Sequence, residues 1–398
     1  MTPALEQFEA DAESFLAAWP LRPEREEGFS WGHGSDDVSI FDELDPLEER
    51  AQLDEVRRWR QRLADAGFAW ITGPEQYGGR ALPRSYEAAF DALARQRAVP
   101  GNSRLTVSLG MIAPTILAHA TETAKQRYLA AMYRGEVVAC QLFSEPQAGS
   151  DLASVTTRAV RDGDGWRVTG QKVWTSGAHL ADIGEVLCRT SENVRHRNLT
   201  AFIIDMHAEG VEVRPLRQMT GGATFNEVFL DDVWVGDECR LGEVDGGWRV
   251  AMTTLTNERG AIGGGGFGGR GLLSLDRLTA LLRHTGRAEE PVARQQFAEL
   301  VCGLRTASWT RQRLAATGAG AEASILKLAL CRDLTRLAAL VSSSLGPSVT
   351  ADTGEWGTFA WTNFLLGLPG YRIGGGTDEV LRTVIGERVL GLPKEPTP

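Results

Sequence analysis

The spacing of apolar residues divides the chain into three regions. In the first region, up to about residue 136, apolar positions recur three to five residues apart with charged residues between them, as at Leu53, Val56, Trp59, Leu63 and Phe68. This spacing is close to the 3.6-residue period of an α-helix. It therefore predicts helices that bury one face, and further helices are expected over residues 85–97, 103–120 and 121–134.

Between about Val137 and Gly242 the pattern changes to short runs rich in β-branched and aromatic residues. Such runs are typical of strands, and they lie at residues 166–168, 172–174, 185–188, 200–204 and 211–213. Glycines punctuate them at positions where turns are expected, namely Gly163, Gly165, Gly170 and Gly210. The region predicts a compact β domain, a barrel or a sandwich, inserted between helical parts.

Helical spacing returns at Asp245 and continues to the C-terminal region. Helices are expected to begin near Trp248 and to span residues 292–315, 321–345 and 377–390. Thr377 suits the N-cap of the last one, with Asp378 and Glu379 in its first turn. The predicted fold class is therefore α+β, with an N-terminal helical domain over 1–136, a β domain over 137–244 and a C-terminal helical bundle over 245–398.

Composition narrows the class of protein. The chain has 398 residues, 42% hydrophobic and 24% charged, with a net charge of −10. This composition predicts a globular protein with a large core. With no basic block and no apolar run of membrane-spanning length, neither nucleic acid nor a membrane is expected as a partner. The N-terminal stretch is acidic, unlike a secretory signal, so a cytoplasmic location is expected.

The cysteines and histidines suggest no metal site. The five cysteines are widely scattered in apolar or helical surroundings, which predicts buried, reduced thiols, and they lie at Cys140, Cys188, Cys239, Cys302 and Cys331. The chain contains neither a Cys-x-x-Cys nor a His-Glu-x-x-His sequence. His179 follows closely after Trp174, but a hydrogen-bonded surface histidine is the favoured interpretation.

One literal motif match is rejected. Gly264, Gly266 and Gly269 spell the G-x-G-x-x-G of dinucleotide-binding proteins. A strand should precede this motif and an acidic residue should follow about 20 positions later, and the sequence offers neither. A narrow helix that makes room for a ligand or for a neighbouring helix explains the glycines better.

The stretch C-Q-L-F-S-E-P-Q-A-G-S-D-L-A-S at residues 140–154 is the first candidate for chemistry. Gly149 lets backbone approach a ligand, while Ser144 and Ser150 offer hydroxyl and amide donors. Alone, such a cluster is more often an ordinary turn. The sequence W-R-V-T-G-Q-K-V-W-T-S-G-A at 166–178, the segment F-N-E-V-F-L-D-D-V-W-V at 225–235 and the block G-G-G-T-D-E-V-L-R-T-V-I-G-E-R-V-L-G at 374–391 strengthen the signal.

Together these blocks resemble the acyl-CoA dehydrogenase family over nearly the whole chain. The resemblance implies an FAD-dependent enzyme whose cofactor contacts come from Gln141, Phe143, Ser144, Gly149, Ser150, Trp174 and Ser176. The tryptophan would stack beside the flavin, and Ser176 keeps the hydroxyl where the family often has threonine. Thr377 and Glu379 match positions near the adenine dinucleotide, while Arg283 and Arg287 are weaker candidates from a divergent loop. The alternative is that all are ordinary turn, cap and core residues.

The main departure from the family pattern is Gly375, because many members carry the catalytic glutamate at this position. The resemblance to isovaleryl- and long-chain-type members places the base instead at Glu258, with Arg259 near the CoA phosphates. Ser150 and Gly375 are the other expected substrate contacts, Gly375 through its backbone N–H. Without the resemblance, Glu258 would be interpreted as an exposed helix residue paired with a basic neighbour.

The implied reaction is α,β-dehydrogenation of an acyl-CoA to the trans-2-enoyl thioester, with Glu258 as base and flavin N5 as hydride acceptor. The implied partners are an electron-transfer flavoprotein and further copies of the chain, in a homotetramer or homodimer. Three alternatives stay open. They are a dehydrogenase acting on acyl-carrier protein, a flavin monooxygenase or oxidase on the same fold, and a non-catalytic subunit of a mixed oligomer.

Overall fold

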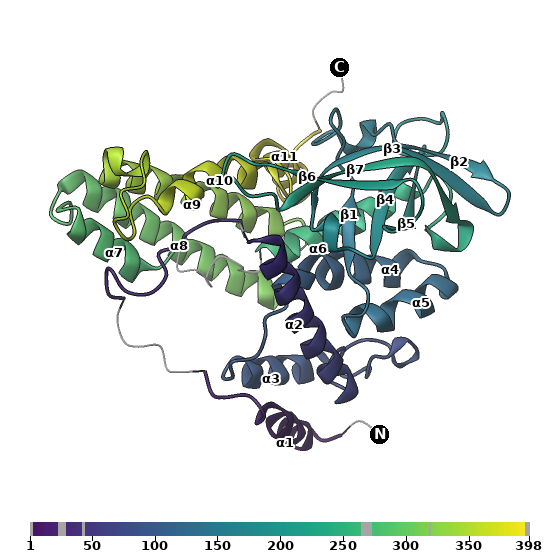
Figure 1. The fold of residues 1–398 in the computed structure, drawn as a ribbon, viewed down its shortest axis with the longest axis horizontal. Coiled ribbons are helices and arrows are strands. Elements are labelled where there is room, and N and C mark those ends of the chain that lie inside the picture. The colour runs from purple at the N-terminus through teal and green to yellow at the C-terminus, as the bar shows by residue number, and fades with distance from the viewer. Residues whose placement is uncertain (1–2, 23–28, 42–43, 264–272, 318–319, 395–398) are drawn as a thin grey trace. The chain divides into compact units, whose positions relative to one another are not determined.

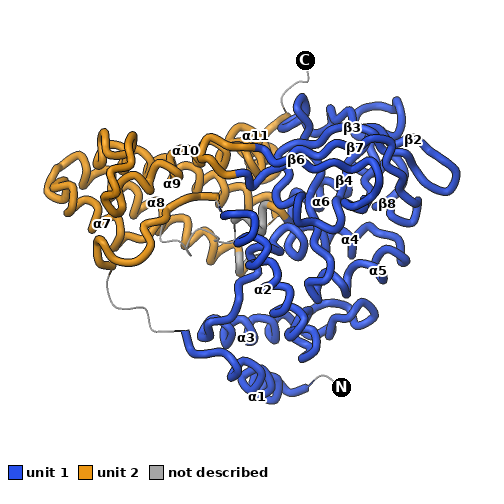
Figure 2. The backbone as a smooth tube through the Cα atoms, in the orientation of Figure 1, with its two compact units in different colours: residues 1–24, 44–216, 223–257 blue, residues 25–43, 217–222, 258–398 orange. Residues whose placement is uncertain are grey.

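The computed structural model describes residues 3–22, 29–41, 44–263, 273–317 and 320–394. The chain divides into two compact units (Figure 2). The first comprises residues 1–24, 44–216 and 223–257, and the second comprises residues 25–43, 217–222 and 258–398. The borders of the three predicted domains stay a prediction. The glycine motif at Gly264, Gly266 and Gly269 lies outside the described residues, as does the side chain of Arg259.

The N-terminal part of the first unit is helical, as predicted (Figure 1). Its α-helices are α1 (Leu5–Leu16), α2 (Pro46–Asp65), α3 (Arg84–Ala94), α4 (Ala113–His119) and α5 (Glu122–Tyr133). The predicted apolar face of α2 is buried, and Asp45 caps this helix by accepting the N–H of Leu47 at 2.8 Å. Thr121 caps α5 in the same way, since its hydroxyl accepts the N–H of Ala124.

The single helix predicted over 103–120 is wrong in part. The segment forms a 3₁₀ turn at Ser103–Leu105, a π-helical turn at Ser108–Ile112 and only then the α-helix α4. Pro114 contributes to the change, because it has no N–H to donate to the carbonyl four residues earlier. Spacing alone cannot reveal this, since apolar residues recur similarly in all three kinds of turn.

The predicted strands form one mixed sheet. It contains β1 (Ala139–Leu142), β2 (Arg158–Asp162), β3 (Gly165–Ser176), β4 (Ile183–Arg189), β5 (Leu199–Asp205), β6 (Val211–Leu216), β7 (Phe225–Gly236) and β8 (Arg240–Leu241). Seven strands follow the order β6-β7-β3-β2-β4-β5-β8, and β1 pairs with β4 in parallel. One hydrophobic core of this unit lies between the sheet and the helices α4, α5 and α6, and another lies among α1, α2 and α3.

Strand β3 joins two runs that the sequence pattern separates. Gly170, expected at a turn, lies inside β3 at an irregularity in its pairing with β7. A Cβ at this position would collide with Thr157, so the glycine is required by close packing between neighbouring segments. The expectation of a turn here was therefore wrong.

Helix α6 (Gly247–Gly263) begins in the first unit, where Val250 and Ala251 are buried. The second unit contains α7 (Leu275–His284), α8 (Pro291–Thr317), α9 (Ala323–Leu345), α10 (Trp361–Ile373) and α11 (Asp378–Val384). Leucines from α7, α8 and α9 form its core together with Trp361 and Phe364. The helix predicted over 377–390 begins as expected, but after Val384 it continues as a π-helical turn.

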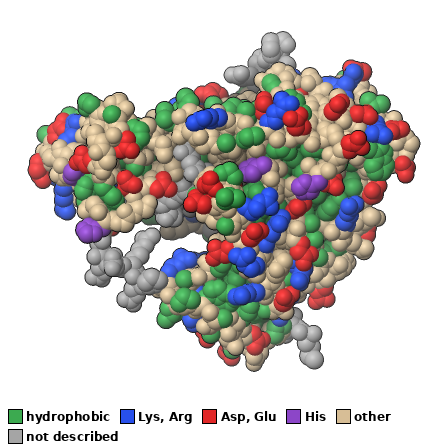
Figure 3. All heavy atoms as spheres, viewed as in Figure 1, with side chains coloured by type: hydrophobic (Ala, Val, Ile, Leu, Met, Phe, Trp, Pro, Cys, Tyr) green, Lys and Arg blue, Asp and Glu red, His purple; other side chains and the backbone are tan. Residues whose placement is uncertain are grey.

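The surface and the cysteines complete the description. On the face shown in Figure 3, acidic, basic and apolar side chains are interspersed. Among the described residues, none of the helices combines the length and the apolar character that a membrane span requires.

Four of the five free cysteines are buried, but Cys302 is exposed, so the expectation of a buried thiol was wrong there. Its helix, α8, turns this position to the surface.

Candidate functional site

The loop after β1 carries the first group of predicted site residues. Gln141 lies in β1, where it pairs with Glu185 of β4, and Phe143 directly after this strand is buried. The backbone carbonyl of Ser144 accepts the N–H of Val173 at 2.9 Å. This hydrogen bond fixes the loop against β3, directly beside the predicted flavin residue Trp174.

A buried ion pair holds the same loop in place. The Nζ atom of Lys172 lies 2.9 Å from Oε1 of Glu145, and neither side chain reaches the surface. Lys172 also donates to the carbonyls of Phe143 and Leu187, at 3.1 and 2.7 Å. The ammonium therefore has three acceptors, which compensate for the loss of its hydration.

Glu145 is surrounded by donors. Besides Lys172, it accepts the backbone N–H groups of Thr156 and Thr157, the hydroxyl of Thr156 and the amide of Gln147, at 2.7 to 2.9 Å. Burial raises the pKa of this carboxyl, but the charge of Lys172 and the hydrogen bonds outweigh burial and bring the pKa to about 2. Glu145 is thus ionised at neutral pH.

Strand β3 is bulged where it carries Trp174. Its register against β7 shifts between Lys172 and Thr175, and Trp174 has a φ of +60°. Tryptophan rarely adopts this left-handed backbone conformation. Because of the bulge, Lys172 and Thr175 are both buried, whereas Trp174 and Ser176 are exposed. The indole is 60% exposed and meets Phe225 edge to face.

Gly149 and Ser150 lie on the exposed part of the same loop. A Cβ at Gly149 would meet no atom of the protein within 4 Å, so packing within the chain does not require glycine here. No hydrogen bond involves the hydroxyl of Ser144, Ser150 or Ser176 within the described residues. Three hydroxyls and an exposed indole are therefore available to a ligand on this part of the first unit.

A second buried carboxyl lies on β4. Glu185 is fully buried, and the one group within hydrogen-bond distance of its two oxygens, among the described residues, is the hydroxyl of Thr254 in α6, at 2.8 and 3.0 Å. That hydroxyl also lies 2.9 Å from the hydroxyl of Thr115 in α4. Burial raises the pKa of Glu185 to about 8, although the hydrogen bond with Thr254 acts in the opposite direction. Glu185 is thus largely protonated at neutral pH.

Helix α6 also carries the predicted base. Glu258 is half-buried and follows Thr254 by four residues, or about one turn of the same helix. Glu258 interacts with another part of the protein. Thr254 lies in the turn of α6 that precedes Glu258. Its hydrogen bond with Glu185 therefore connects this turn to β4 of the sheet.

In the second unit, the predicted residues around Gly375 form a tight turn. Gly375 and Gly376 have φ values of +69° and +92°, a region that favours glycine. The buried Lys327 donates to the carbonyl of Gly376 at 2.9 Å and fixes this turn. The absence of a side chain at Gly375 therefore has a conformational reason, whatever its chemical role.

The predicted adenine-dinucleotide contacts have roles within the second unit. The hydroxyl of Thr377 accepts the N–H of Val380 at 3.3 Å, which confirms the predicted cap. Glu379 is exposed and lies 3.7 Å from Arg382. Arg287 pairs with Glu290 at 2.6 Å, so this weaker candidate already has a partner in its own loop.

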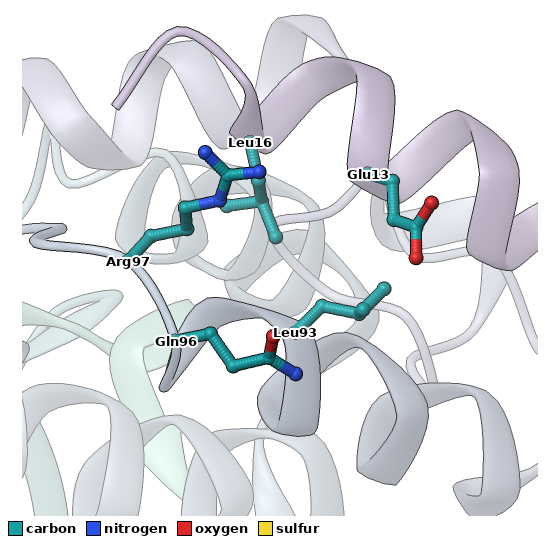
Figure 4. A pocket seen from close by; sticks show the side chains of 5 residues that line it. All are labelled: Glu13, Leu16, Leu93, Gln96 and Arg97. Carbon is teal, nitrogen blue, oxygen red and sulfur yellow. The ribbon is translucent and has the colours of Figure 1, made fainter. Parts of the chain in front are cut away.

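Figure 4 shows a shallow pocket elsewhere in the first unit. Its lining residues come from α1, from α3 and from the segment that follows α3, namely Glu13, Leu16, Leu93, Gln96 and Arg97. Arg97 donates to the backbone carbonyl of Trp19 at 3.1 Å. None of these residues belongs to the predicted site, and the arginine helps to hold the N-terminal segment in place.

Comparisons with known proteins decide the family. Models of the acyl-CoA dehydrogenase N-terminal, middle and C-terminal domains match residues 39–136, 140–233 and 245–390. Acyl-CoA dehydrogenase IpdE1 of Mycobacterium tuberculosis is 38% identical, over 88% of this chain and 91% of that protein. The chain belongs to the acyl-CoA dehydrogenase family. It is therefore an oxidoreductase of the class that acts on CH–CH bonds.

Two further comparisons agree with the family. Acyl-CoA dehydrogenase FadE34 of the same organism is 40% identical over 87% of this chain, which spans only 48% of the length of FadE34. The solved structure of the Tcur3481-Tcur3483 steroid acyl-CoA dehydrogenase superposes with a TM-score of 0.73 at 25% identity, covering 99% of both chains. The predicted acyl-CoA dehydrogenase fold is thus confirmed.

Acyl-CoA dehydrogenases are flavoproteins with FAD as the family cofactor, and the residues of the first unit fit such a group. An exposed indole offers a flat surface to an aromatic ring, Gly149 leaves room for close approach, and Ser144 and Ser176 offer donors. The structure brings together Ser144, Trp174 and Ser176, through the hydrogen bond between Ser144 and Val173. Glu258, Gly375, Thr377 and Glu379 belong to the other unit.

Three buried ionisable residues that shape these segments were missed by the sequence analysis. They are the partners Lys172 and Glu145, and the isolated acid Glu185. A charged residue in the middle of an apolar strand was the available signal for Glu185, whereas Lys172, among the polar residues of its strand, gave none. Glu145, in a turn-like stretch rich in polar residues, gave no signal of burial.

Proposed function

We propose that this acyl-CoA dehydrogenase introduces a trans double bond between the α- and β-carbons of an acyl-CoA thioester. The observation that carries the proposal is Trp174, exposed on the bulge of β3 beside the loop that holds Ser144. A large aromatic side chain in a rare backbone conformation at the surface is unfavourable for the chain alone. Contact with a flat cofactor explains it.

The chain's own groups have three tasks in this reaction. Trp174 with the hydroxyls of Ser144, Ser150 and Ser176 would hold FAD, together with Gln141, Phe143 and Gly149 in the same loop and with Thr377 and Glu379. Bound FAD supplies the acceptor for the hydride that leaves the β-carbon. Glu258 takes the proton from the α-carbon, and the backbone N–H of Gly375 donates to the thioester oxygen as negative charge develops there.

The assignment of the base to Glu258 is supported by the backbone at Gly375. With a φ of +69°, this position favours glycine and offers no side chain for proton transfer. Glu258 lies in α6, in the turn after Thr254, and so on an element anchored to the sheet. A base on a fixed helix can keep its carboxylate in one place relative to the substrate, which proton abstraction requires.

We further propose a bulky, ring-bearing or branched acyl group as the substrate class. The support is the likeness to the steroid acyl-CoA dehydrogenase, at 25% identity over 99% of the chain. Arg259 is proposed for the CoA phosphates, and an electron-transfer flavoprotein for reoxidation. A homotetramer or homodimer and a cytoplasmic location stay predictions of the sequence.

The test is anaerobic reduction of the FAD-loaded protein by straight-chain, branched and ring-bearing acyl-CoAs, followed by flavin absorbance. We expect the ring-bearing or branched class to remove the flavin absorbance fastest. Glu258→Gln should keep FAD but slow the reduction about 10²- to 10⁴-fold, the usual contribution of a positioned base. Glu289→Gln, at a highly exposed site on the surface, is the control for the same loss of charge.

Each contrary result would contradict a different part of the proposal. Reduction of the Glu258→Gln variant at the original rate would exclude Glu258 as the base. Firm FAD binding without reduction by any acyl-CoA would contradict the CoA substrate and favour a carrier-bound thioester or oxygen chemistry. FAD binding only after addition of a homologous chain would favour a subunit of a mixed oligomer.

A further inference from the structure

A chain of polar side chains connects helix α2 to the bulged end of β3. Arg104 donates to Oε1 of Glu49 at 3.1 Å, and Oε2 of Glu49 lies 2.8 Å from Nε2 of His179. On the other side of the ring, Nδ1 of His179 lies 3.2 Å from Nδ2 of Asn226. The same amide nitrogen of Asn226 donates to the backbone carbonyl of Thr175 at 3.1 Å.

The hydrogen-bond pattern allows one arrangement of protons. The carbonyl of Thr175 can only accept, so the atom of Asn226 facing it must be the NH₂ group. That group donates to His179, and Nδ1 therefore carries no proton. The proton of the neutral ring must then be on Nε2, where it donates to Glu49. The hydrogen bond from His179 lowers the pKa of Glu49, and Arg104 contributes to the same effect.

The network ends at the backbone between two proposed cofactor residues. Thr175 lies between Trp174 and Ser176, and Asn226 is its partner across the β3–β7 pair. Both Thr175 and Asn226 are buried, and the side-chain oxygen of Asn226 has no partner among the described residues. The two hydrogen bonds from its NH₂ group are therefore the ones that orient this side chain. Loss of a hydrogen bond leaves a buried amide group unsatisfied, which destabilises the folded protein.

We propose that His179 is a positioning residue for the cofactor strand. Its Nδ1 atom accepts from Asn226, and Asn226 in turn holds the Thr175 carbonyl, which fixes the bulge that exposes Trp174 and Ser176. Glu49 and Arg104 select the tautomer of His179 that can accept in this way. The inference depends on the proposed function only for the identity of the ligand, FAD, that the bulge would contact.

Two substitutions of His179 separate its hydrogen bond with Asn226 from its hydrogen bond with Glu49. Asparagine places an oxygen near the position of Nδ1, so His179→Asn can accept from Asn226 but does not reach Glu49. Glutamine reaches towards the position of Nε2, so His179→Gln can donate to Glu49 but offers no acceptor at the position of Nδ1. Both variants lose the imidazole, and each is therefore the control for the other.

The first measurement needs no cofactor. Hydrogen exchange of the backbone amides in a peptide covering residues 172–180 reports on the bulge in the purified full-length protein. We expect exchange in His179→Gln to be about tenfold faster than in the original protein, the equivalent of one lost buried hydrogen bond. His179→Asn should keep the original rate. Equal rates in both variants would overturn the inference.

The second measurement separates positioning from plain stability. We expect His179→Gln to bind FAD about tenfold more weakly and to shift its visible absorption bands, while His179→Asn keeps the original affinity and spectrum. Faster exchange in His179→Gln with unchanged FAD affinity and spectrum would overturn the positioning role and leave a structural one. Failure of the original protein to bind FAD would instead overturn the proposed function and the identity of the ligand, and the hydrogen-exchange comparison alone would then decide whether His179 fixes the bulge.

Discussion

Two buried carboxyl groups of the first unit have opposite charge states. Glu145, in the loop after β1, has a pKa of about 2, whereas Glu185, on β4, has a pKa of about 8. Neither side chain is accessible to solvent to any useful extent. Burial therefore raises the pKa of both groups, and their neighbours decide whether the charge survives.

The neighbours differ in number and in charge. Glu145 accepts from five donors, one of which is the ammonium group of Lys172. Glu185 accepts from the hydroxyl of Thr254 alone, among the residues that the structure describes. An ionised carboxylate can accept about four hydrogen bonds, so one hydroxyl cannot replace the water that Glu185 loses. Its neutral form is the stable one.

The two acids also hold different parts of the unit. Glu145 fixes the loop with the proposed cofactor residues through a charge that stays constant above acidic pH. Glu185 connects β4 to α6 through a group that titrates near neutral to mildly alkaline pH. The comparison predicts that the attachment of the loop after β1 through Glu145 does not change with pH near neutrality, whereas the attachment of α6 through Glu185 does.

The strongest test removes the cation from the first site. Lys172→Met keeps most of the volume but leaves the carboxylate of Glu145 without its counter-charge. We expect the free energy of unfolding to fall by about 3–5 kcal/mol, the usual effect of leaving one buried charge unpaired. Urea unfolding of the purified protein measures this change.

A double variant is the control for that test. In Lys172→Met with Glu145→Gln no buried charge remains at this site, so more than half of the lost stability should return. If the single variant loses less than about 1 kcal/mol, Glu145 does not depend on Lys172 for its charge. The contrast with Glu185 would then have another origin.

Glu185→Gln tests the second site through pH. The folded pKa of about 8 lies above the ordinary value of 4.5, so between these values the folded protein holds a proton that the unfolded chain has released. Stability of the original protein therefore falls as pH rises through this window, by up to about 1.4 kcal/mol per pH unit, and levels off above it. Glutamine is neutral at every pH and removes this slope.

Urea unfolding across this pH window measures the difference between the two proteins. We expect similar stability near the acidic end and a growing advantage of Glu185→Gln towards the alkaline end. Parallel curves for the two proteins would show that Glu185 is ionised in the folded state. The comparison with Glu145 would then fail at its central point.

The sequence predicted the order of helices and strands because that order follows from apolar spacing. The buried face of α2 and the cap at Thr377 depend on residues close together in the chain. The bulge at Trp174 could not be predicted in this way. It depends on how β3 pairs with β7, more than 50 residues later in the sequence.

The same reasoning applies to the buried charges. The pair Lys172 and Glu145 joins residues 27 positions apart, and the hydrogen bond between Glu185 and Thr254 joins residues 69 positions apart. Local patterns contain no information on which distant donor meets which acid. The motif resemblance correctly indicated the family, but it could not show what holds Trp174 in place.

The smallest change in the free energy of unfolding is expected when one hydrogen bond is removed at Glu185 or at Glu145. Thr254→Val deletes the hydroxyl donor of Glu185, and Gln147→Ala deletes one of the five donors of Glu145. We expect Thr254→Val to lower the free energy of unfolding by about 1–3 kcal/mol, because no second donor can replace the first. Gln147→Ala should lower it by less than about 1 kcal/mol.

The pH dependence of stability distinguishes the variants Thr254→Val and Gln147→Ala. The hydroxyl of Thr254 lowers the pKa of Glu185, so Thr254→Val should extend the loss of stability to a higher pH. Gln147→Ala should leave the neutral and alkaline range unchanged, since Glu145 keeps Lys172 and three other donors. Equal losses in the two variants, with equal pH dependence, would show that the number of donors does not determine the charge states of these two acids.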